Sequence, residues 1–246
     1  MSGLDALRLL IGAGFLTYAS VLDLRTRRVP NNVWIALGFL AALLFIFDWA
    51  GDGRFTWITA LVALGGILLM YVLWYVHILA GGADAKALMA ISILLPQPIV
   101  WSLLGATFPL WPSPMPGVIV VLANSVLAFA LAPFALFLVN LVRGDVRFPA
   151  MLLGYRMPLS KTRDAFVWVV DHVNAEGKRR QLLFPSAMSD EDYDANLERL
   201  EQAGEKRVWV TPKIPFMVPL LFGFLGTFFV GDILFRLVTV IVERLR

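Results

Sequence analysis

The sequence predicts an α-helical polytopic membrane protein, with about six transmembrane helices and a small α+β cytoplasmic domain between the fifth and sixth helices. Three observations support this fold class. Of the 246 residues, 59% are hydrophobic and only 16% are charged, and the mean hydropathy is +0.76, far from the values of soluble globular domains. Apolar runs of about 20 residues, the length that crosses a bilayer, recur along the chain. One long polar stretch separates the last run from the others.

Six apolar runs are long enough to span a membrane, and we expect each to form one helix. They cover residues 4–22, 33–50, 55–79, 85–109, 117–142 and 215–236. The first run ends in an arginine cluster rather than a small-residue cleavage site, so we expect it to stay in the protein. A Gly-Asp-Gly-Arg turn at 51–54 follows the second run, and a proline-rich loop with a tryptophan anchor at 111–117 precedes the fifth.

The polar stretch between the fifth and sixth runs has the pattern of a small folded domain. Residues 165–170 and 180–184 predict the two strands of a hairpin, with a turn at 174–177. Residues 207–211 predict a third strand that leads into the last helix. A hairpin and a further strand are therefore expected to form the β part of this domain.

A helix is predicted between the hairpin and the third strand. Ser189 and Asp192 resemble a capping box, an apolar stripe follows at spacings of four and three, and Gly204 marks the stop. The stripe consists of Tyr193, Leu197 and Leu200. The predicted domains are residues 1–142 for a five-helix membrane part, 143–213 for the cytoplasmic domain and 214–246 for the sixth helix.

Composition excludes several classes of site. The chain has no cysteine, which excludes disulfides, thiolate metal sites and cysteine nucleophiles. His77 and His172 are too few and too far apart for a zinc site, so no metal and no cofactor are predicted. The formal charge of +3 reflects membrane topology rather than a nucleic-acid partner. Any catalysis must therefore come from carboxylates, hydroxyls or lysines.

The distribution of basic residues predicts the orientation in the membrane, because lysine and arginine concentrate in cytoplasmic loops. With the N-terminus outside, the inner segments are 23–32, 80–86 and 143–213, which hold most of the 21 basic residues. Arg236, Arg244 and Arg246 would then lie outside, which counts against this orientation. The short basic cluster after Asp23 carries the most weight, and it places both Asp23 and Asp84 at the cytoplasmic face.

Asp23 and Asp84 are the most informative residues of the chain. Each lies where an apolar run meets a basic or glycine-rich flank. Carboxylates are costly beside hydrocarbon, so two of them at one face of a bilayer indicate a functional site, with each the partner of the other. The alternative is that each is a juxtamembrane charge that reaches water. Asp5, Asp48, Asp52 and Asp232 are expected near the opposite face, away from this pair.

Two carboxyl groups within a few ångströms do not ionise together, so one keeps a proton while the other stays charged. The charged group can take a proton from water as the water attacks a peptide carbonyl, and the protonated group can hydrogen-bond the developing oxyanion. This is the chemistry of an aspartic protease, and it needs no metal, thiol or histidine. The sequence does not reveal which of Asp23 and Asp84 holds the proton.

Residues beside the aspartates have both a functional and a structural interpretation. Gly81 and Gly82 let the backbone turn sharply before Asp84 and let a substrate approach, or they form an ordinary interhelical turn. Lys86 tunes Asp84 or binds substrate carbonyls, or it is a lysine at the membrane edge. Pro30 and Asn31 are expected to start the second helix, with the asparagine as its cap, which is a structural role.

Two motifs of this chain resemble those of a known family. Asp23 is followed by the basic cluster and by Val-Pro-Asn at 29–31, and Gly-Gly-Ala-Asp-Ala-Lys stands at 81–86. In this order, about sixty residues apart and each at a helix edge, they resemble the type IV prepilin peptidases and archaeal preflagellin peptidases, which are GxGD aspartic membrane proteases. Residues 209–219, with Gly-Asp at 231–232, resemble the end of the archaeal branch.

The resemblance implies that Asp23 and Asp84 are the catalytic pair, although Ala83 stands where the strict motif has glycine. It implies preflagellin or prepilin precursors as substrates, cut after a short basic class III signal peptide at the cytoplasmic face of an archaeal cell membrane. Bacterial members commonly have a cysteine-containing domain and methylate the new N-terminus. Because this chain lacks cysteine and places its polar domain late, we expect peptidase activity without methyltransferase activity.

An acidic face on the predicted soluble helix is a candidate contact for the basic leader of such a substrate. Its residues are Asp190, Glu191, Asp192, Asp194, Glu198 and Glu201. The structural alternative is a solvated helix face, which needs no ligand.

Three other functions stay open at this level. A transporter that binds an ion or proton at the two aspartates predicts charges near the bilayer midplane and paired halves, whereas both aspartates stand at segment ends and no repeat is visible. An intramembrane protease of the presenilin kind predicts a Tyr-Asp motif, whereas Leu22 precedes Asp23. A non-catalytic membrane adaptor predicts that mutation of either aspartate is silent. The sequence predicts no oligomeric state.

Overall fold

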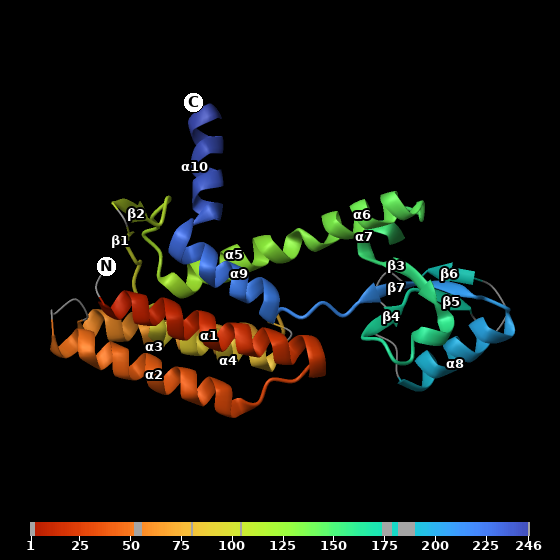
Figure 1. Cartoon of the computed structure of the whole chain (residues 1–246), viewed down its shortest axis with the longest axis horizontal. Helices are drawn as coiled ribbons and strands as arrows, with labels where there is room; N and C mark the ends of the chain where they lie inside the picture. Colours follow the sequence, from red (N-terminus) through yellow and green to blue (C-terminus); the bar gives the residue numbers. More distant parts are fainter. Residues whose placement is uncertain are drawn as a thin grey trace. The chain divides into compact units, whose positions relative to one another are not determined.

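The structure is a computed structural model that describes residues 3–51, 56–79, 81–103, 105–173, 179–181 and 190–245. The chain forms two compact units (Figure 1). The first consists of Met1–Phe129 together with Pro215–Arg246, and the second consists of Ala130–Ile214. The predicted domain limits after residues 142 and 213 stay a prediction, since compactness alone divides the chain after 129 and 214.

The first unit is a helical bundle with one small hairpin. Its elements are α1 (Gly3–Thr26), α2 (Asn31–Ala50), α3 (Trp57–Tyr75), α4 (Gly82–Leu94), β1 (Trp101–Leu103), β2 (Ala106–Phe108), α5 (Gly117–Ala130), α9 (Met217–Phe229) and α10 (Ile233–Leu245). Helix α4 packs against α1, α2 and α3, and α9 packs against α1 (Figure 1).

Within the described residues, four helical stretches are long and apolar enough to cross a membrane. They are Leu4–Thr26, Asn31–Ala50, Trp57–Tyr75 and Gly117–Arg143, and Met217–Phe229 is a shorter apolar helix. The predicted α-helical polytopic membrane protein with a small strand-containing domain is therefore confirmed. The number of six transmembrane helices stays a prediction.

The fourth predicted helix, at 85–109, is shorter than expected. Helix α4 ends at Leu94 because Pro96 and Pro98 follow and proline cannot continue a helix. The chain then forms the antiparallel β1–β2 hairpin, in which Trp101 pairs with Phe108. A count of apolar residues does not register this break, because the residues of the hairpin are as apolar as those of the helix.

The sixth predicted helix, at 215–236, is two helices. Gly231 adopts a φ of +95°, and a Cβ at this position would overlap the carbonyl oxygen of Trp111. Such a backbone favours glycine and ends α9. Asp232 then starts α10, where its Oδ1 accepts a hydrogen bond of 2.9 Å from the Phe235 N–H. The fifth predicted run also forms two helices, α5 and α6 (Ala132–Arg143), and Pro133 stands in the first turn of α6.

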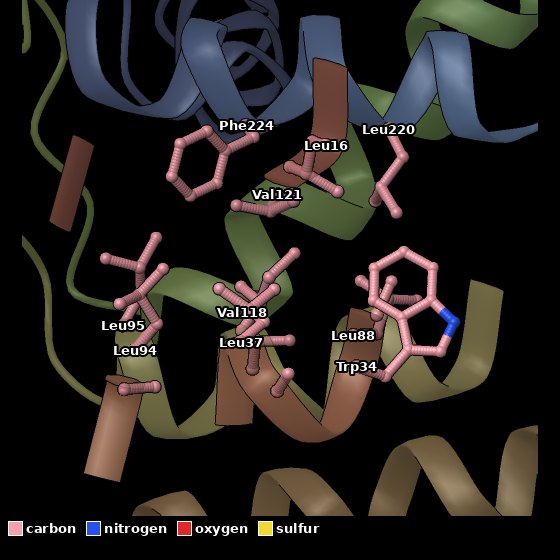
Figure 2. Packing of buried hydrophobic residues seen from close by; sticks show 14 of the residues in the cluster. Leu16, Trp34, Leu37, Leu88, Leu94, Leu95, Val118, Val121, Leu220 and Phe224 are labelled. Carbon is pink, nitrogen blue, oxygen red and sulfur yellow. The ribbon is translucent and has the colours of Figure 1, made fainter. Parts of the chain in front are cut away.

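The core of the first unit joins helices that are distant in the sequence. Figure 2 shows Leu16 of α1, Leu37 of α2, Val121 of α5 and Phe224 of α9 pointing into one cluster. A Cβ on Gly12 would overlap the Phe224 ring. This glycine therefore lets α9 approach α1 closely, which is how small residues promote packing between membrane helices.

The second unit has the predicted α+β character. Besides α6, it contains α7 (Ala150–Leu153), β3 (Tyr155–Pro158), a 3₁₀ turn (Leu159–Lys161), β4 (Val167–Val169), β5 (Asp171–Val173), β6 (Arg179–Gln181), α8 (Asp190–Gln202) and β7 (Arg207–Pro212). The strand predicted at 207–211 is β7, which lies between β3 and β4 in an antiparallel sheet. In the predicted helix, now α8, Leu197 and Leu200 are buried and Tyr193 packs against the same cluster.

The predicted strand pairing in the second unit is wrong. Strand β4, which falls within 165–170, pairs with β7, and the hairpin with β6 is made by the next segment, β5. The buried side chains of Val167 and Val169 belong to the core beside β7, so the alternating pattern identified a strand without identifying its partner. The turn at 174–177, the end of the predicted strand at 182–184 and the Ser189 cap lie outside the described residues.

Candidate active site

Asp84 lies in the first turn of α4, outside the four spanning stretches. Free backbone N–H groups and the positive end of the helix dipole favour an acidic side chain at this position. A Cβ on Gly81 would overlap the Asp84 carboxyl group, whereas a Cβ on Gly82 would lie 3.6 Å from Trp74 Nε1, an ordinary contact. Gly81 therefore makes room for the carboxyl group, while Gly82 carries no such constraint.

Asp23 lies in the last turn of α1 and is held by the start of α9. The backbone N–H of Met217, the first residue of α9, donates a hydrogen bond to the Asp23 carboxylate. One turn earlier on α1, the buried Ser20 Oγ donates a 3.0 Å hydrogen bond to the Met217 carbonyl oxygen. Helix α1 thus binds both the N–H and the carbonyl group of Met217, and these contacts orient Asp23.

The end of α1 places a positive charge beside Asp23. Arg27 adopts a left-handed φ of 56°, and its N–H donates a 3.1 Å hydrogen bond to the Asp23 carbonyl oxygen. A left-handed residue just past a helix end is a common C-terminal stop. The turn brings the Arg27 guanidinium close enough to interact electrostatically with the Asp23 carboxylate.

The two aspartates come together at one end of the bundle. Burial raises the pKa of Asp84 to about 7, and the negative charge of Asp23 contributes to this rise in pKa. Such coupling requires that the two carboxyl groups lie near each other. The last turn of α1 and the first turn of α4 therefore place the two residues that the sequence singled out at the same end of the bundle.

Lys86 and Asn31 also meet, in a different way from the expected one. Lys86 Nζ donates a 2.7 Å hydrogen bond to Asn31 Oδ1 and so links α4 to the start of α2. The expectation that the asparagine caps α2 is wrong: Pro30 occupies the N-cap position, and no side chain caps the helix. The reason is that Asn31 is already the first helical residue, so its side chain is free to bind Lys86.

The acidic face of α8 lies in the second unit. Glu191, Asp194 and Glu198 are exposed, as are Asp192 and Glu201, and the side chain of Asp190 lies outside the described residues. Glu201 makes an exposed ion pair of 4.0 Å with Arg163, a contact that contributes little to stability. Contact of this face with a substrate leader stays a prediction.

The other aspartates have structural surroundings. Arg8 is 2% exposed and binds both Asp5, at 3.2 Å, and Asp48, while its Nε donates a 3.0 Å hydrogen bond to the Leu94 carbonyl oxygen. This buried cluster joins the ends of α1, α2 and α4 at the end of the bundle opposite Asp23. The sequence offered only the Asp5–Arg8 spacing as a sign of it. Asp52 lies outside the described residues.

Sequence reasoning also missed Ser20 and Met217. Neither carries a pattern that points to a site, because one is a single hydroxyl on an apolar helix and the other acts through its backbone. The series of prolines around residue 215 was the nearest signal, since proline removes helix donors and leaves the remaining ones available.

Comparisons with known proteins identify the family of the chain. The profile of the type IV leader peptidase family matches residues 10–139, more than half of the chain, and includes both aspartates. The profile described as archaeal peptidase A24 C-terminus, type II, matches residues 147–233.

Three preflagellin peptidases are similar to the chain over nearly their whole length. The protein of Methanococcus maripaludis is 25% identical over 240 positions, with 91% of this chain and 94% of the relative covered. That of Methanococcus voltae is 26% identical, with 90% and 94% covered, and that of Methanocaldococcus jannaschii is 27% identical, with 91% and 93% covered. The chain therefore belongs to the type IV leader peptidase family and is a membrane peptidase.

Proposed function

We propose that this protein is an aspartic endopeptidase that removes the short basic signal peptide of preflagellin, or of related type IV pilin-like precursors, at the cytoplasmic face of the cell membrane. The observation that carries the proposal is the position of the two aspartates at one end of the bundle, Asp23 in the last turn of α1 and Asp84 in the first turn of the packed helix α4. The similarity to three preflagellin peptidases supports the choice of substrate.

The surroundings of the two carboxyl groups support a different role for each. Asp23 accepts a hydrogen bond from a backbone N–H and lies near the Arg27 charge. Asp84 is the carboxyl group whose pKa is raised to about 7 by burial and by the Asp23 charge. Asp23 is therefore the base, and Asp84 is the acid that holds the shared proton.

Hydrolysis then needs only the substrate, one water molecule and these two side chains. Asp23 takes a proton from the water as its oxygen attacks the carbonyl carbon of the scissile peptide, and Asp84 hydrogen-bonds the developing oxyanion. When the tetrahedral intermediate collapses, the C–N bond breaks and the amine leaving group receives the proton held by Asp23. The products are the leader carboxylate and the new N-terminal amine.

An apolar groove of about 400 Å³ lies between α2, α3 and α4 and accepts the hydrophobic segment of the precursor in this proposal. Asn31 and Lys86 line one end of the groove, and the remaining lining is mainly apolar. Lys86 is two positions from Asp84 in the sequence. The exposed acidic face of α8 attracts the basic leader through charge complementarity.

Cleavage of a preflagellin by the purified protein tests the proposed function. The detergent-purified enzyme should convert the precursor into one shorter product, and mass spectrometry should place the cut directly after the basic leader. An intact precursor, with correctly folded enzyme present, would contradict the proposal and favour transport or an adaptor role.

Loss of the Ser20 hydroxyl is expected to slow cleavage. In Ser20→Ala, kcat should fall about tenfold, between the ~1 kcal/mol of one hydrogen bond and the roughly 100-fold cost of a 1 Å misplacement. KM should change little, and Ser20→Thr should restore activity. Ser92→Ala is the matched control, because its buried hydroxyl donates a 2.9 Å hydrogen bond to the Leu88 carbonyl oxygen within its own helix. Equal loss in both variants would exclude a positioning role for Ser20.

Filling the groove is expected to weaken substrate binding. A Cβ on Gly38 meets no atom within 4 Å, so Gly38→Leu should fold normally while its side chain occupies the groove. KM should rise about tenfold, equivalent to ~1.4 kcal/mol of lost binding. Gly14→Leu on α1 is the control, since that glycine also faces open space but does not line the groove. An unchanged KM in Gly38→Leu would remove the groove from the proposal.

The pH dependence of cleavage follows from the assignment of the acid. Because Asp84 acts in its protonated form and its pKa is about 7, kcat/KM should be retained below pH 7. It should fall about tenfold per pH unit above it. A profile of kcat/KM from pH 5 to 9 measures this limb. Constant activity up to pH 9 would contradict protonated Asp84 as the acid.

A further inference from the structure

Helix α10 is apolar over most of its circumference, yet none of its thirteen residues is buried. Seven large apolar side chains of this helix are exposed, namely Leu234, Phe235, Leu237, Val238, Ile241, Val242 and Leu245. Arg236, Thr239 and Glu243 follow each other at spacings of three and four, so they form one narrow polar stripe. A helix with this pattern needs an apolar surrounding on every side except the stripe.

The start of α10 is fixed at the end of the bundle opposite Asp23 and Asp84. Asp232 caps the helix, and its Oδ2 accepts a 2.6 Å hydrogen bond from Ser113 Oγ. Asn124 Nδ2 donates a 2.8 Å hydrogen bond to the Gly231 carbonyl oxygen, and Asn124 Oδ1 accepts one of 3.3 Å from the Ile233 N–H. These contacts hold the first turn of α10 against the loop before α5 and against α5 itself.

The first turn of α10 lies at the end of the bundle where the spanning helices begin and end. Asp232 lines one small crevice together with Leu95, just past the end of α4. The neighbouring Leu94 accepts a hydrogen bond from Arg8, which also binds Asp48, two residues before α2 ends. Helix α10 therefore starts at the edge of the membrane rather than within it.

The direction and length of α10 differ from those of the spanning helices. The left-handed Gly231 redirects the chain, and Figure 1 shows α10 leaving the bundle across the direction of α1. Thirteen residues of helix measure about 20 Å, which is shorter than the roughly 30 Å hydrocarbon core. Because α1 is a spanning helix, a helix that starts at the edge and runs across it lies along the membrane surface.

We infer that α10 is an interfacial helix that lies in the plane of the bilayer surface, with its apolar face among the lipid acyl chains and its polar stripe towards water. Arg236 and Arg244 supply positive charges that reach lipid phosphate groups, which is a typical arrangement for interfacial helices. Large exposed apolar side chains also occur on α1 to α3, among them Leu10, Ile46 and Leu68. The lipid bilayer is thus the partner of this face.

Spin labels at single cysteines test the inference, because the natural chain has no cysteine. Val238→Cys and Leu245→Cys place labels two turns apart on the apolar face, and Glu243→Cys places one on the polar stripe. Each variant is purified, checked for monodispersity and inserted into nanodiscs with anionic phospholipid. Collision with oxygen and with a water-soluble nickel chelate then gives the depth of each label.

Equal depths below the phosphates at Val238 and Leu245, with Glu243 in water, are the expected result. Leu61→Cys and Leu68→Cys are the matched control, since these exposed residues of α3 are also seven positions apart but lie on a spanning helix. Their depths should differ by about 10 Å. A similar difference between Val238 and Leu245 would overturn the inference in favour of a crossing helix.

Two further outcomes would also overturn the inference. Labels that are all accessible to the nickel chelate would place α10 in water. Strong spin–spin broadening at Val238, lost when labelled protein is diluted with unlabelled protein, would show that a second copy of the chain covers the face. None of these measurements depends on peptidase activity, so the inference stands or falls separately from the proposed function.

Discussion

Asp23→Asn and Asp84→Asn are each expected to abolish cleavage of preflagellin while the protein remains folded. The amide keeps the size of the carboxylate but neither takes a proton from water nor supplies one. Loss of general acid or base catalysis costs about 100- to 10,000-fold, and loss of the shared proton removes the remaining partner's role as well. The rate of product formation, followed by gel and mass spectrometry with excess enzyme, measures the effect.

The control for these variants is Asp164→Asn, which changes an exposed aspartate of the second unit and should leave the rate unchanged. Thermal unfolding in detergent should show similar stability for all three variants. If either Asp23→Asn or Asp84→Asn cleaves at the wild-type rate, the aspartic mechanism is wrong. If both fail to cleave but still bind the precursor, the loss lies in chemistry rather than in binding.

Gly81→Ala is expected to reduce cleavage by about 100-fold or more, while Gly82→Ala should remain within about twofold of the wild type. The added methyl group at Gly81 would overlap the Asp84 carboxyl group, and a displacement of about 1 Å at a reacting group can cost 100-fold. At Gly82 the methyl group would meet only Trp74 Nε1, at 3.6 Å. Single-turnover rates of the two variants measure the difference.

Backbone strain at residue 81 does not contribute to the expected difference between Gly81→Ala and Gly82→Ala. Gly81 has φ −96° and ψ 122°, which alanine adopts without strain, so any effect comes from the added side chain. Both variants should be as stable as the wild type in thermal unfolding. Equal rates in Gly81→Ala and Gly82→Ala would show that Gly81 does not make room for a reactive carboxyl group.

Long apolar segments were predictable because the physical rule for them is local. A run of about 20 apolar residues identifies a spanning helix wherever it occurs, and α1, α2 and α3 follow that rule within a few residues. The rule failed where one backbone feature outweighs composition. Prolines after Leu94 shorten α4, and the left-handed Gly231 divides the last helix, although the surrounding residues are as apolar as before.

The candidate site was partly predictable for a similar reason. Carboxylates are costly beside hydrocarbon, so Asp23 and Asp84 were identified by residue type and position alone. Their supporting contacts were not. The Met217 N–H acts through the backbone, which every residue other than proline possesses, and Ser20 differs little from other small residues of α1. Asn31 was assigned to the wrong partner because a cap and a hydrogen bond to Lys86 use the same side chain.

The sequence by itself determined the membrane class, the main helices, the polar second unit and the two aspartates, because each depends on composition or on spacing along one segment. Only the tertiary structure decided that Gly81 makes room for Asp84, that α9 holds Asp23, that β4 pairs with β7 and that α10 leaves the bundle. These features are contacts between segments far apart in the chain. Hydrogen bonds and close approaches of this kind depend on three-dimensional distance, which no local pattern encodes.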